Sequence, residues 1–296
     1  MSKISTKRSS IALASMLGVL VTLAGGATPA MAEDRASTAA GVVRYNAIWE
    51  PGDDARPRVH TYTSHDLIAR NSELFNQGYR IDSISQTRLD NGESRYDAIW
   101  RPGSGSSPLV IGWSEQQFWN QNAIYWEQGL RLWRVNRYLH NGAFHYDGIW
   151  KPGTDGRRVV AGWTLDALLA EDIRMRALGY RLIQTAGVRE DLLGSEIRYI
   201  GIWMPGTDAR PTLFGATWDE MIQANANHWT NGYRTKYLNV YRTHQGHLRY
   251  DVIWEPGNDG RPVLTAPAYA ELVARDAEFQ TAGYRMTLVQ GYVSPS

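Results

Sequence analysis

The side chains best suited to metal chemistry in this 296-residue chain are histidines beside short turns. His244 and His247 flank Gln245-Gly246, so we expect them to face each other across a hairpin. His140 and His145 bracket a second turn less closely. Two imidazoles do not complete a zinc site, and no third ligand is identifiable. We therefore expect exposed turn residues here, and neither a bound metal nor another cofactor.

Carboxylates offer acid–base chemistry, but their spacing does not select a pair. A glycosidase needs two carboxyl groups about 5–10 Å apart. Candidates are Glu115, Glu127, Asp166, Glu171, Asp219 and Glu220. The chain contains no G-x-S-x-G, S-x-x-K, H-E-x-x-H or Walker-type motif. A hydrolase acting on a peptide or cell-wall glycan, from the centre of the molecule or a cleft, is therefore an alternative function with unknown catalytic residues.

Aromatic residues indicate a different kind of site. They are concentrated in two stretches, 113–133 and 218–229. The candidates are Trp113, Trp119, Trp126, Trp133, Trp218, His228 and Trp229. Exposed aromatic rings suit sugar rings and protein partners, so these residues are the candidate ligand-binding set. Bulkier core side chains are the alternative interpretation.

A repeat provides the elements that position these residues. The phrase RYDAIWRPG has five close copies, whose tryptophans are Trp49, Trp100, Trp150, Trp203 and Trp254. A second phrase, GYR or GLR, recurs with the same period and begins at Gly78, Gly129, Gly179, Gly232 and Gly283. A period near 50 residues predicts five copies of one structural unit.

Each unit is predicted to contain a β-hairpin, a short strand and a helix. The helix ends at the GYR glycine, which permits a left-handed backbone. Ser64, Ser114 and Thr164 are natural helix caps, and Ser114 with Gln117 resembles a capping box. Turns such as Asn141-Gly142 predict the hairpin, and Pro-Gly ends its second strand.

One polar residue recurs on the apolar stripe of each predicted helix. These residues are Asn71, Asn122, Asp172, Asn225 and Asp276. A half-buried amide or carboxylate must be hydrogen-bonded, and we expect its partner to be loop backbone or the GYR arginine. Five equivalent groups do not make an active site, which needs dissimilar groups. The repeated phrase is therefore a building block, and specialised chemistry is expected where the copies differ.

The two ends of the repeat region are complementary halves of one hairpin. Val42–Trp49 lacks a preceding strand, and Tyr284–Val293 lacks a following one. We expect them to pair and to close an α+β pseudo-five-fold ring, either a barrel wrapped by helices or an α/β propeller. Closure removes two open sheet edges. Residues 42–293 would then be one domain.

The first 32 residues have the pattern of a secretory signal peptide. Basic residues precede an apolar run that ends in Ala30-Met31-Ala32, so we expect export to the extracellular or periplasmic space and a short linker, 33–41. Removing this leader leaves 28 basic against 30 acidic residues. That balance argues against binding nucleic acid or an anionic membrane by charge, and no later segment approaches the length of apolar sequence that membrane insertion requires. The absence of cysteine excludes disulfides and thiolate metal sites.

The phrases RYDAIWRPG and QGYRIDSIS resemble the bacterial tandem repeat domain. This repeat of about 50 residues also occurs in the non-catalytic part of polyglycine hydrolases, beside a β-lactamase-like serine peptidase domain. The resemblance extends over Val42–Gly291 and implies architecture rather than an activity. We expect a secreted binding module whose aromatic-rich face takes an extracellular polysaccharide, peptide or protein, a secreted peptidase being one candidate partner.

Overall fold

The computed structural model describes residues 42–189 and 196–294. The predicted signal peptide, residues 1–32, and the linker, residues 33–41, lie outside the described residues. The described chain forms fifteen strands and five helices. No helix in these two ranges has both the length and the apolar character that crossing a membrane requires.

Four modules are continuous in sequence, and each contains a short strand, a helix and a hairpin. Module one contains β2 (Arg58–Tyr62), α1 (Ser64–Asn76), β3 (Tyr79–Arg88) and β4 (Ser94–Pro102). Module two contains β5 (Leu109–Ser114), α2 (Glu115–Glu127), β6 (Leu130–His140) and β7 (Ala143–Pro152). Module three contains β8 (Arg158–Trp163), α3 (Leu165–Ala177), β9 (Tyr180–Arg189) and β10 (Ile197–Pro205). Module four contains β11 (Thr212–Ala216), α4 (Trp218–Thr230), β12 (Tyr233–Arg242) and β13 (Leu248–Pro256).

The fifth module combines the two ends of the described chain. It contains β1 (Val43–Pro51), β14 (Val263–Thr265), α5 (Tyr269–Thr281) and β15 (Tyr284–Val293). Its sheet has the order β14-β1-β15, and β1 pairs antiparallel with β15 along its whole length. The predicted pairing of the N-terminal and C-terminal strands is therefore confirmed.

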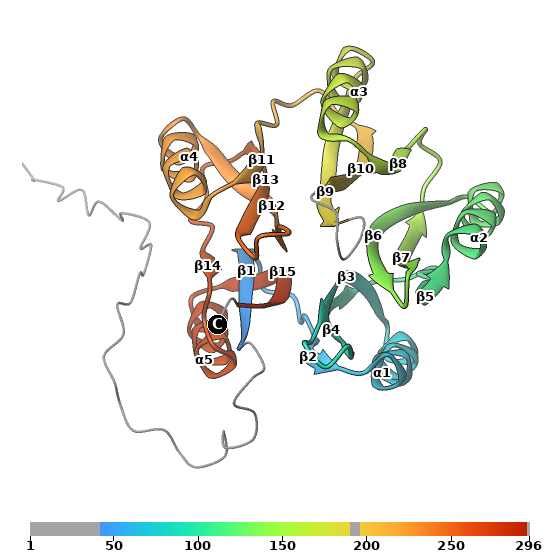
Figure 1. Ribbon diagram of the computed structural model, residues 1–296. Helices are drawn as coiled ribbons and strands as arrows, with labels where there is room; N and C mark the ends of the chain where they lie inside the picture. The colour runs from blue at the N-terminus through green and yellow to red at the C-terminus, as the bar shows by residue number, and fades with distance from the viewer. Residues whose placement is uncertain (1–41, 190–195, 295–296) are drawn as a thin grey trace, which may run out of the picture.

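Each module has its own three-stranded antiparallel sheet. The strand that carries the RYDAIW-like phrase is always central, as in the order β2-β4-β3. The described strands thus form five separate sheets and not the single continuous sheet of the barrel alternative. In Figure 1 the helices lie on the outside, and β3, β6, β9, β12 and β15 face the middle of the molecule. We call these five the inner strands; each contacts the next, and β15 contacts β3.

The helix boundaries follow the sequence signals, with one exception. Ser114 caps α2 in a capping box with Gln117, and Thr164 caps α3, as predicted. In α1 the cap is Thr63, whose hydroxyl accepts the Asp66 N–H at 3.2 Å, so the prediction of Ser64 as the cap was wrong. The five GYR or GLR glycines have φ between +73° and +85°, a left-handed conformation that favours glycine.

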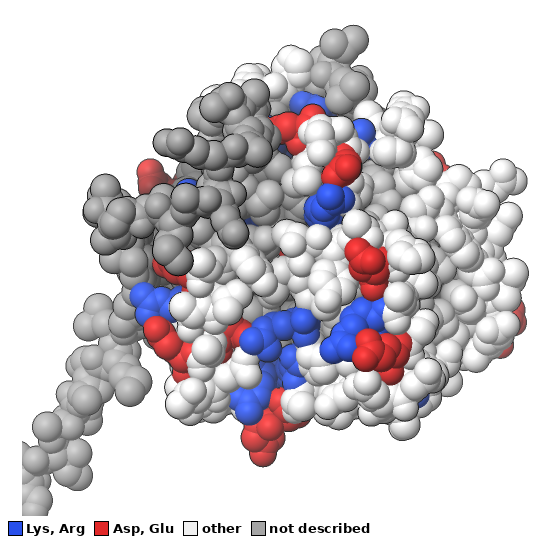
Figure 2. Space-filling model, turned by 90° about the horizontal axis from the view of Figure 1, so that it is seen from below, with Lys and Arg blue, Asp and Glu red and all other residues white. Residues whose placement is uncertain are grey.

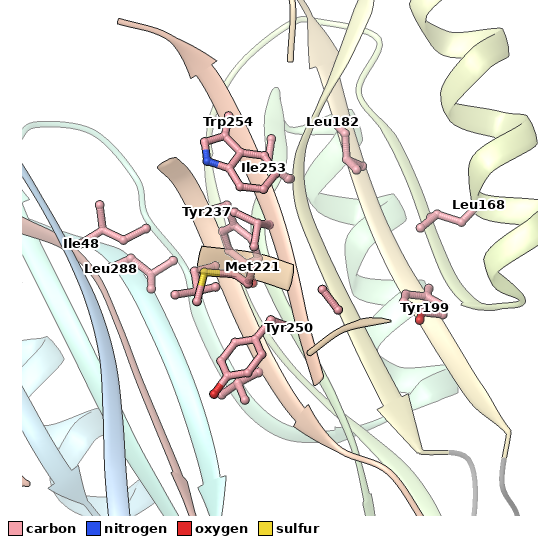
Figure 3. Packing of buried hydrophobic residues seen from close by; sticks show 14 of the residues in the cluster. Ile48, Leu168, Leu182, Tyr199, Met221, Tyr237, Tyr250, Ile253, Trp254 and Leu288 are labelled. Atoms are coloured by element: carbon pink, nitrogen blue, oxygen red, sulfur yellow. The ribbon is translucent and has the colours of Figure 1, made fainter. Parts of the chain in front are cut away.

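The central strand of each sheet is buried on both faces. In β4, Tyr96, Ala98 and Trp100 pack with residues of their own helix, whereas Ile99 joins the core of module five. Ile149 and Ile202 likewise join the cores of modules one and two. Figure 3 shows the corresponding contact at the other end of the chain, where Ile48 of module five lies beside side chains of module four. Neighbouring modules therefore share their hydrophobic cores.

The polar residue on each helix accepts a hydrogen bond from the tryptophan of its own module. The Nε1–Oδ1 distances are 2.8 Å for Trp49–Asp276, 2.9 Å for Trp100–Asn71 and for Trp150–Asn122, 2.8 Å for Trp203–Asp172 and 3.0 Å for Trp254–Asn225. The expectation of a loop or GYR-arginine partner was wrong. The GYR arginines instead donate to backbone carbonyls, as Arg131 Nε does to Asp155 O at 2.6 Å.

Candidate functional site

A cavity of about 560 Å³ lies between the five inner strands. Every inner strand contributes to its wall, and the lining extends to the hairpin turns at Asp90 and at Asn141-Gly142. We call it the axial cavity. Its volume is within the range of small-ligand sites in proteins, about 300–1,000 Å³.

A β-bulge in each inner strand determines which side chains reach this cavity. The bulged residue is the fourth after the GYR glycine: Asp82, Trp133, Ile183, Lys236 and Thr287 are each skipped in the pairing with the central strand. A bulge re-aims the side chains that follow it. The cavity lining then begins at the next residue in four strands, namely Ser83, Arg134, Tyr237 and Leu288. Equivalent positions therefore present dissimilar groups.

Arg134 is the charged residue in this layer of the cavity. Its Cζ lies 4.6 Å from the Trp133 ring and 5.9 Å from the Tyr237 ring of module four, which is not a neighbouring module. The guanidinium therefore reaches across the axial region. Its Nη1 donates to the Trp133 carbonyl at 3.0 Å, whereas its buried Nε has no hydrogen-bond acceptor among the described residues. Burial lowers the pKa of Arg134, against the attraction of Asp82.

Asp82 anchors a charged network at the same level, between modules one and two. Its carboxylate pairs with Lys151 and with Arg101, the latter at 2.6 Å from Nε to Oδ2. Burial would raise the pKa of Asp82, but Lys151, Arg101 and Arg134 outweigh burial and hold this pKa at about 2. The Trp133 indole donates to the Asp82 carbonyl at 2.9 Å and stacks under Lys151. Two of the bulged residues, Asp82 and Trp133, thus link modules one and two beside the cavity.

The described lining of the axial cavity is strongly cationic. It contains five arginines, Arg88, Arg134, Arg137, Arg189 and Arg242, and a single carboxylate, Asp90. The outer surface differs: on the side shown in Figure 2, basic and acidic atoms lie in small adjacent groups separated by uncharged surface. A cavity lined by charge of one sign concentrates ligands of the opposite sign.

Two buried carboxylates lie behind the inner strands, on the central strands β7 and β13. Asp147 accepts from the Gly112 N–H at 2.9 Å and from the Tyr138 hydroxyl at 3.1 Å. Asp251 accepts from backbone N–H groups of Gly215 and Gly187 at 3.0 and 2.9 Å. Burial raises the pKa of Asp147 to about 7 and that of Asp251 to about 6. These groups do not line the cavity, and their partners assign them a structural role.

The aromatic residues predicted to bind ligand are not brought together. Figure 1 shows α2 and α4 on different sides of the molecule, with module three between their modules. Trp126 and Trp229 end these two helices, where the guanidinium carbons of Arg131 and Arg234 lie 3.5 and 3.6 Å above their rings. Phe75 under Arg80 repeats this stack at 3.6 Å. The stack is therefore a feature of the repeat.

The remaining aromatic candidates pack mainly against their own modules. Trp113 and Trp119 lie against the core of module two, and Trp218 contacts the Tyr250 ring of module four. His228 lies 4.4 Å from the Trp254 ring, and burial lowers its pKa. Trp133, by contrast, contacts Arg134 at the axial cavity.

The histidines at the turns do not assemble a metal site in the described part of the chain. His244 and His247 are exposed, and no group of three potential metal ligands occurs among the described residues. The His140 and His145 rings contact each other at 5.6 Å, but each Nδ1 already has a partner, Arg88 and the Gly112 carbonyl.

The cavity residues were not predicted, because the expectations rested on the repeated phrases and on the aromatic residues of the helices. The useful signal was the position after each bulge, where the copies are Ser83, Arg134, Gln184, Tyr237 and Leu288. Five different side chains at one position of a strict repeat mark a place where the copies diverge.

Comparison with known families matches two of the modules. Residues 59–102 and 209–257 match the family model described as polyglycine hydrolase-like, structural repeat. These boundaries nearly coincide with modules one and four, each a short strand, a helix and a hairpin. No match was found among curated proteins or among solved structures.

Proposed function

We propose that this chain, which carries repeats of the polyglycine hydrolase-like structural-repeat family, is a secreted binding protein that folds as a closed five-module ring and takes its ligand in the axial cavity. The observation that carries the proposal is the cavity itself, which five repeated strands line with five different sets of side chains. Its ligand would be an extracellular polysaccharide, peptide or protein segment that enters the cavity.

Ring closure is supported by hydrogen bonds at every junction between modules. Each bond below joins a side chain of one module to the backbone of the module before it. They are Asp97 Oδ2 to Gly291 N at 3.1 Å, Trp133 Nε1 to Asp82 O at 2.9 Å, Gln184 Nε2 to Val135 O at 2.7 Å, Asp251 Oδ2 to Gly187 N at 2.9 Å, and Gln290 Nε2 to Val240 O at 3.2 Å. A propeller-like ring is the architecture that accounts for all five junctions.

The cavity chemistry favours binding over hydrolysis. Hydrolysis by general acid and base requires two proton-transfer groups with separated pKa values near the substrate. Asp90 is the single carboxylate in the described lining, and that lining contains no histidine. Arginine, amide and hydroxyl groups, such as Arg134, Asn136 and Ser83, can instead hold and orient a polar ligand.

A variant that fills the cavity tests this proposal. Ala186 is a small residue of the cavity wall that also packs against the core of module two, so Ala186→Phe would add a phenyl ring at this edge of the cavity. The protein from Glu33 to Ser296 is incubated with insoluble chitin, cellulose and peptidoglycan, and with culture-medium proteins and peptides. Depletion of the protein or capture of a ligand is measured, together with any release of soluble fragments. We expect binding by the wild type and at least a tenfold loss in Ala186→Phe.

The matched control is Ala177→Phe, which adds the same ring to the exposed end of α3. Circular dichroism and thermal unfolding of all three proteins establish that they are folded. Equal binding by Ala186→Phe and the wild type would place the ligand site outside the cavity, and Trp126 and Trp229 would be the next surfaces to test. Release of fragments by the wild type would replace the binding proposal with the hydrolase alternative.

A further inference from the structure

We infer that the axial cavity is a carboxylate site, in which the ligand's carboxylate binds the guanidinium of Arg134. The inference rests on the proposed role of the cavity in binding and specifies the chemistry of its ligand. The ligand is an acid small enough for a cavity of about 560 Å³, such as the free end of a short peptide or an acidic sugar.

Arg134 differs from the other basic groups at this depth. Arg101 and Lys151 both pair with Asp82, and Arg157 pairs with Asp155 at 2.9 Å. The described residues offer Arg134 no ion pair: its one hydrogen bond goes to a backbone carbonyl. Asp82, which already pairs with Arg101 and Lys151, attracts Arg134 without contacting it. A buried charge without a direct counter-charge is costly, and a charged ligand supplies that contact.

The unused donors of Arg134 have a defined geometry. Nη1 of Arg134 is engaged by the Trp133 carbonyl, and Nε is buried without an acceptor among the described residues. Nε and Nη2 form the edge of the guanidinium that matches the two oxygens of a carboxylate. The Trp133 ring, 4.6 Å from Cζ, restricts the orientation of this edge. The site is therefore built for a planar, bidentate anion.

Other arginines of the cavity would attract an anion toward Arg134. Arg88 and Arg242 also line the cavity, near its hairpin-turn end, and donate to the carbonyls of Leu139 and Val293 at 3.0 and 2.8 Å. These backbone acceptors fix the two guanidiniums without neutralising them. The described lining thus carries a net positive charge from its hairpin-turn end, where Asp90 is its one carboxylate, to Arg134, and this charge attracts an anion.

The test uses paired probes that differ in the carboxylate. Trialanine with a free carboxylate is compared with trialanine amide, and galacturonic acid is compared with galactose. Binding is measured by isothermal titration calorimetry at low ionic strength. We expect each acid to bind at least tenfold more tightly than its uncharged match. The acid that binds more tightly identifies a peptide end or an acidic sugar as the source of the carboxylate.

Variants of Arg134 then locate the anion. We expect Arg134→Gln to lose at least tenfold in affinity for the acid and to retain its thermal stability, because no protein carboxylate loses a partner directly bonded to it. Arg134→Lys keeps the positive charge but lacks the two-donor edge of the guanidinium, so this variant should bind the acid with intermediate affinity. The control Arg70→Gln removes the same charge from an exposed pair with Glu73 on α1 and should bind normally.

The outcomes separate this inference from the proposed function. Equal binding of acid and amide, or unchanged affinity in Arg134→Gln, would overturn the carboxylate inference, as would failure of every acid to bind the wild type. If Ala186→Phe still abolished binding of a natural ligand, the cavity would remain the binding site with a different chemistry. If Ala186→Phe bound that ligand normally, the cavity proposal would fail independently of Arg134.

Discussion

At the scale of single residues, the indole–helix hydrogen bond is the contact that defines each module. All five tryptophans of the repeated phrase are fully buried, so each Nε1–H needs an acceptor. The acceptor is an amide in three modules and a carboxylate in two. The two carboxylates have extra donors: Asp172 accepts from Arg176 at 2.6 Å, and Asp276 accepts from Gln280 at 2.7 Å and pairs with Arg58. A charged acceptor thus occurs where further donors reach its second oxygen.

Removing one acceptor should therefore be costly. Asn122→Leu leaves the Trp150 indole buried without its partner at 2.9 Å, and we expect the free energy of unfolding to fall by about 1–3 kcal/mol. Urea denaturation monitored by circular dichroism measures the change. Asn120→Leu, on the exposed side of the same helix, is the control and should change stability by less than about 0.5 kcal/mol. An Asn122→Leu protein as stable as this control would show that the hydrogen bond contributes no net stability.

Sequence reasoning identified these polar residues but not their partner. The period of the helix placed Asn71 and its equivalents on the buried stripe, and burial required a hydrogen bond. Nothing in the spacing relates a helix position to a residue about 29 positions later on a strand, because that distance depends on how the helix crosses the sheet. The repeated tryptophan served only to mark the period, although its N–H needs an acceptor as much as the amide needs a donor.

At the scale of elements, the bulges in the inner strands explain what sequence reasoning missed. A two-residue alternation predicts which side chains share a face, and it succeeds for the unbulged central strands, where Tyr96, Ala98 and Trp100 face one helix. In β6, the bulge between Leu132 and Arg134 interrupts that alternation. No turn residue or glycine marks this bulge in the sequence. The two-residue alternation therefore does not lead to the candidate site, whose sequence signal is the divergence of the copies after the bulge. The helices, hairpins and strand pairing could be derived from the pattern.

The central strands also give the protein a distinctive pH dependence. Asp147 and Asp251 have folded-state pKa values of about 7 and 6, above the ordinary value of 3.8. Between pH 4 and these values the folded state holds protons that the unfolded state has released. Stability therefore falls as pH rises through this window, by at most about 1.4 kcal/mol per pH unit for each group. Carboxylates with lowered pKa, such as Asp82 and Glu171 at about 2, change stability with pH only below this window.

We expect Asp147→Asn to flatten this dependence. The amide oxygen can still accept the Gly112 N–H, and the variant has no proton to lose. The difference in urea midpoint between pH 5 and pH 7.5 should therefore be smaller than in the wild type. Asp166→Asn on the exposed surface of α3 is the control and should leave the wild-type difference unchanged. An equal pH dependence in Asp147→Asn and the wild type would contradict a raised pKa for this buried carboxylate.

At the scale of the whole molecule, the repeat explains both stability and the location of the site. Each module shares its core with a neighbour, because isoleucines such as Ile99 and Ile149 pack into the module before their own. Such sharing leaves an open array with two exposed apolar ends, which closure would bury. The same arrangement brings five inner strands around one cavity. Side chains that differ between the copies therefore lie together in its lining. The period of the sequence predicts this symmetry, but only the three-dimensional arrangement shows where it is broken.

If the ring is closed, removing β1 alone should change the stability and the association state of the protein. This strand lies between β14 and β15, and its Tyr45, Ile48 and Trp49 are at most 1% exposed. A chain that starts at Asp53 would lose the centre of that sheet and expose the cores of modules five and four. We expect such a protein to lose several kcal/mol of stability or to self-associate, because two strand edges and a large apolar surface become free.

The comparison protein should start at Val42, which keeps β1. Thermal unfolding measures the stability of the two proteins, and size-exclusion chromatography measures their self-association. A synthetic peptide of residues 42–52 added to the shorter chain should restore part of the lost melting temperature, since it can pair with β15 in the native register. A peptide with Ile48→Asp and Trp49→Asp should not restore it. If the shorter chain melted within about 2 °C of the longer one and stayed monomeric, the N-terminal strand would be dispensable and the five modules would form an open array rather than a closed ring.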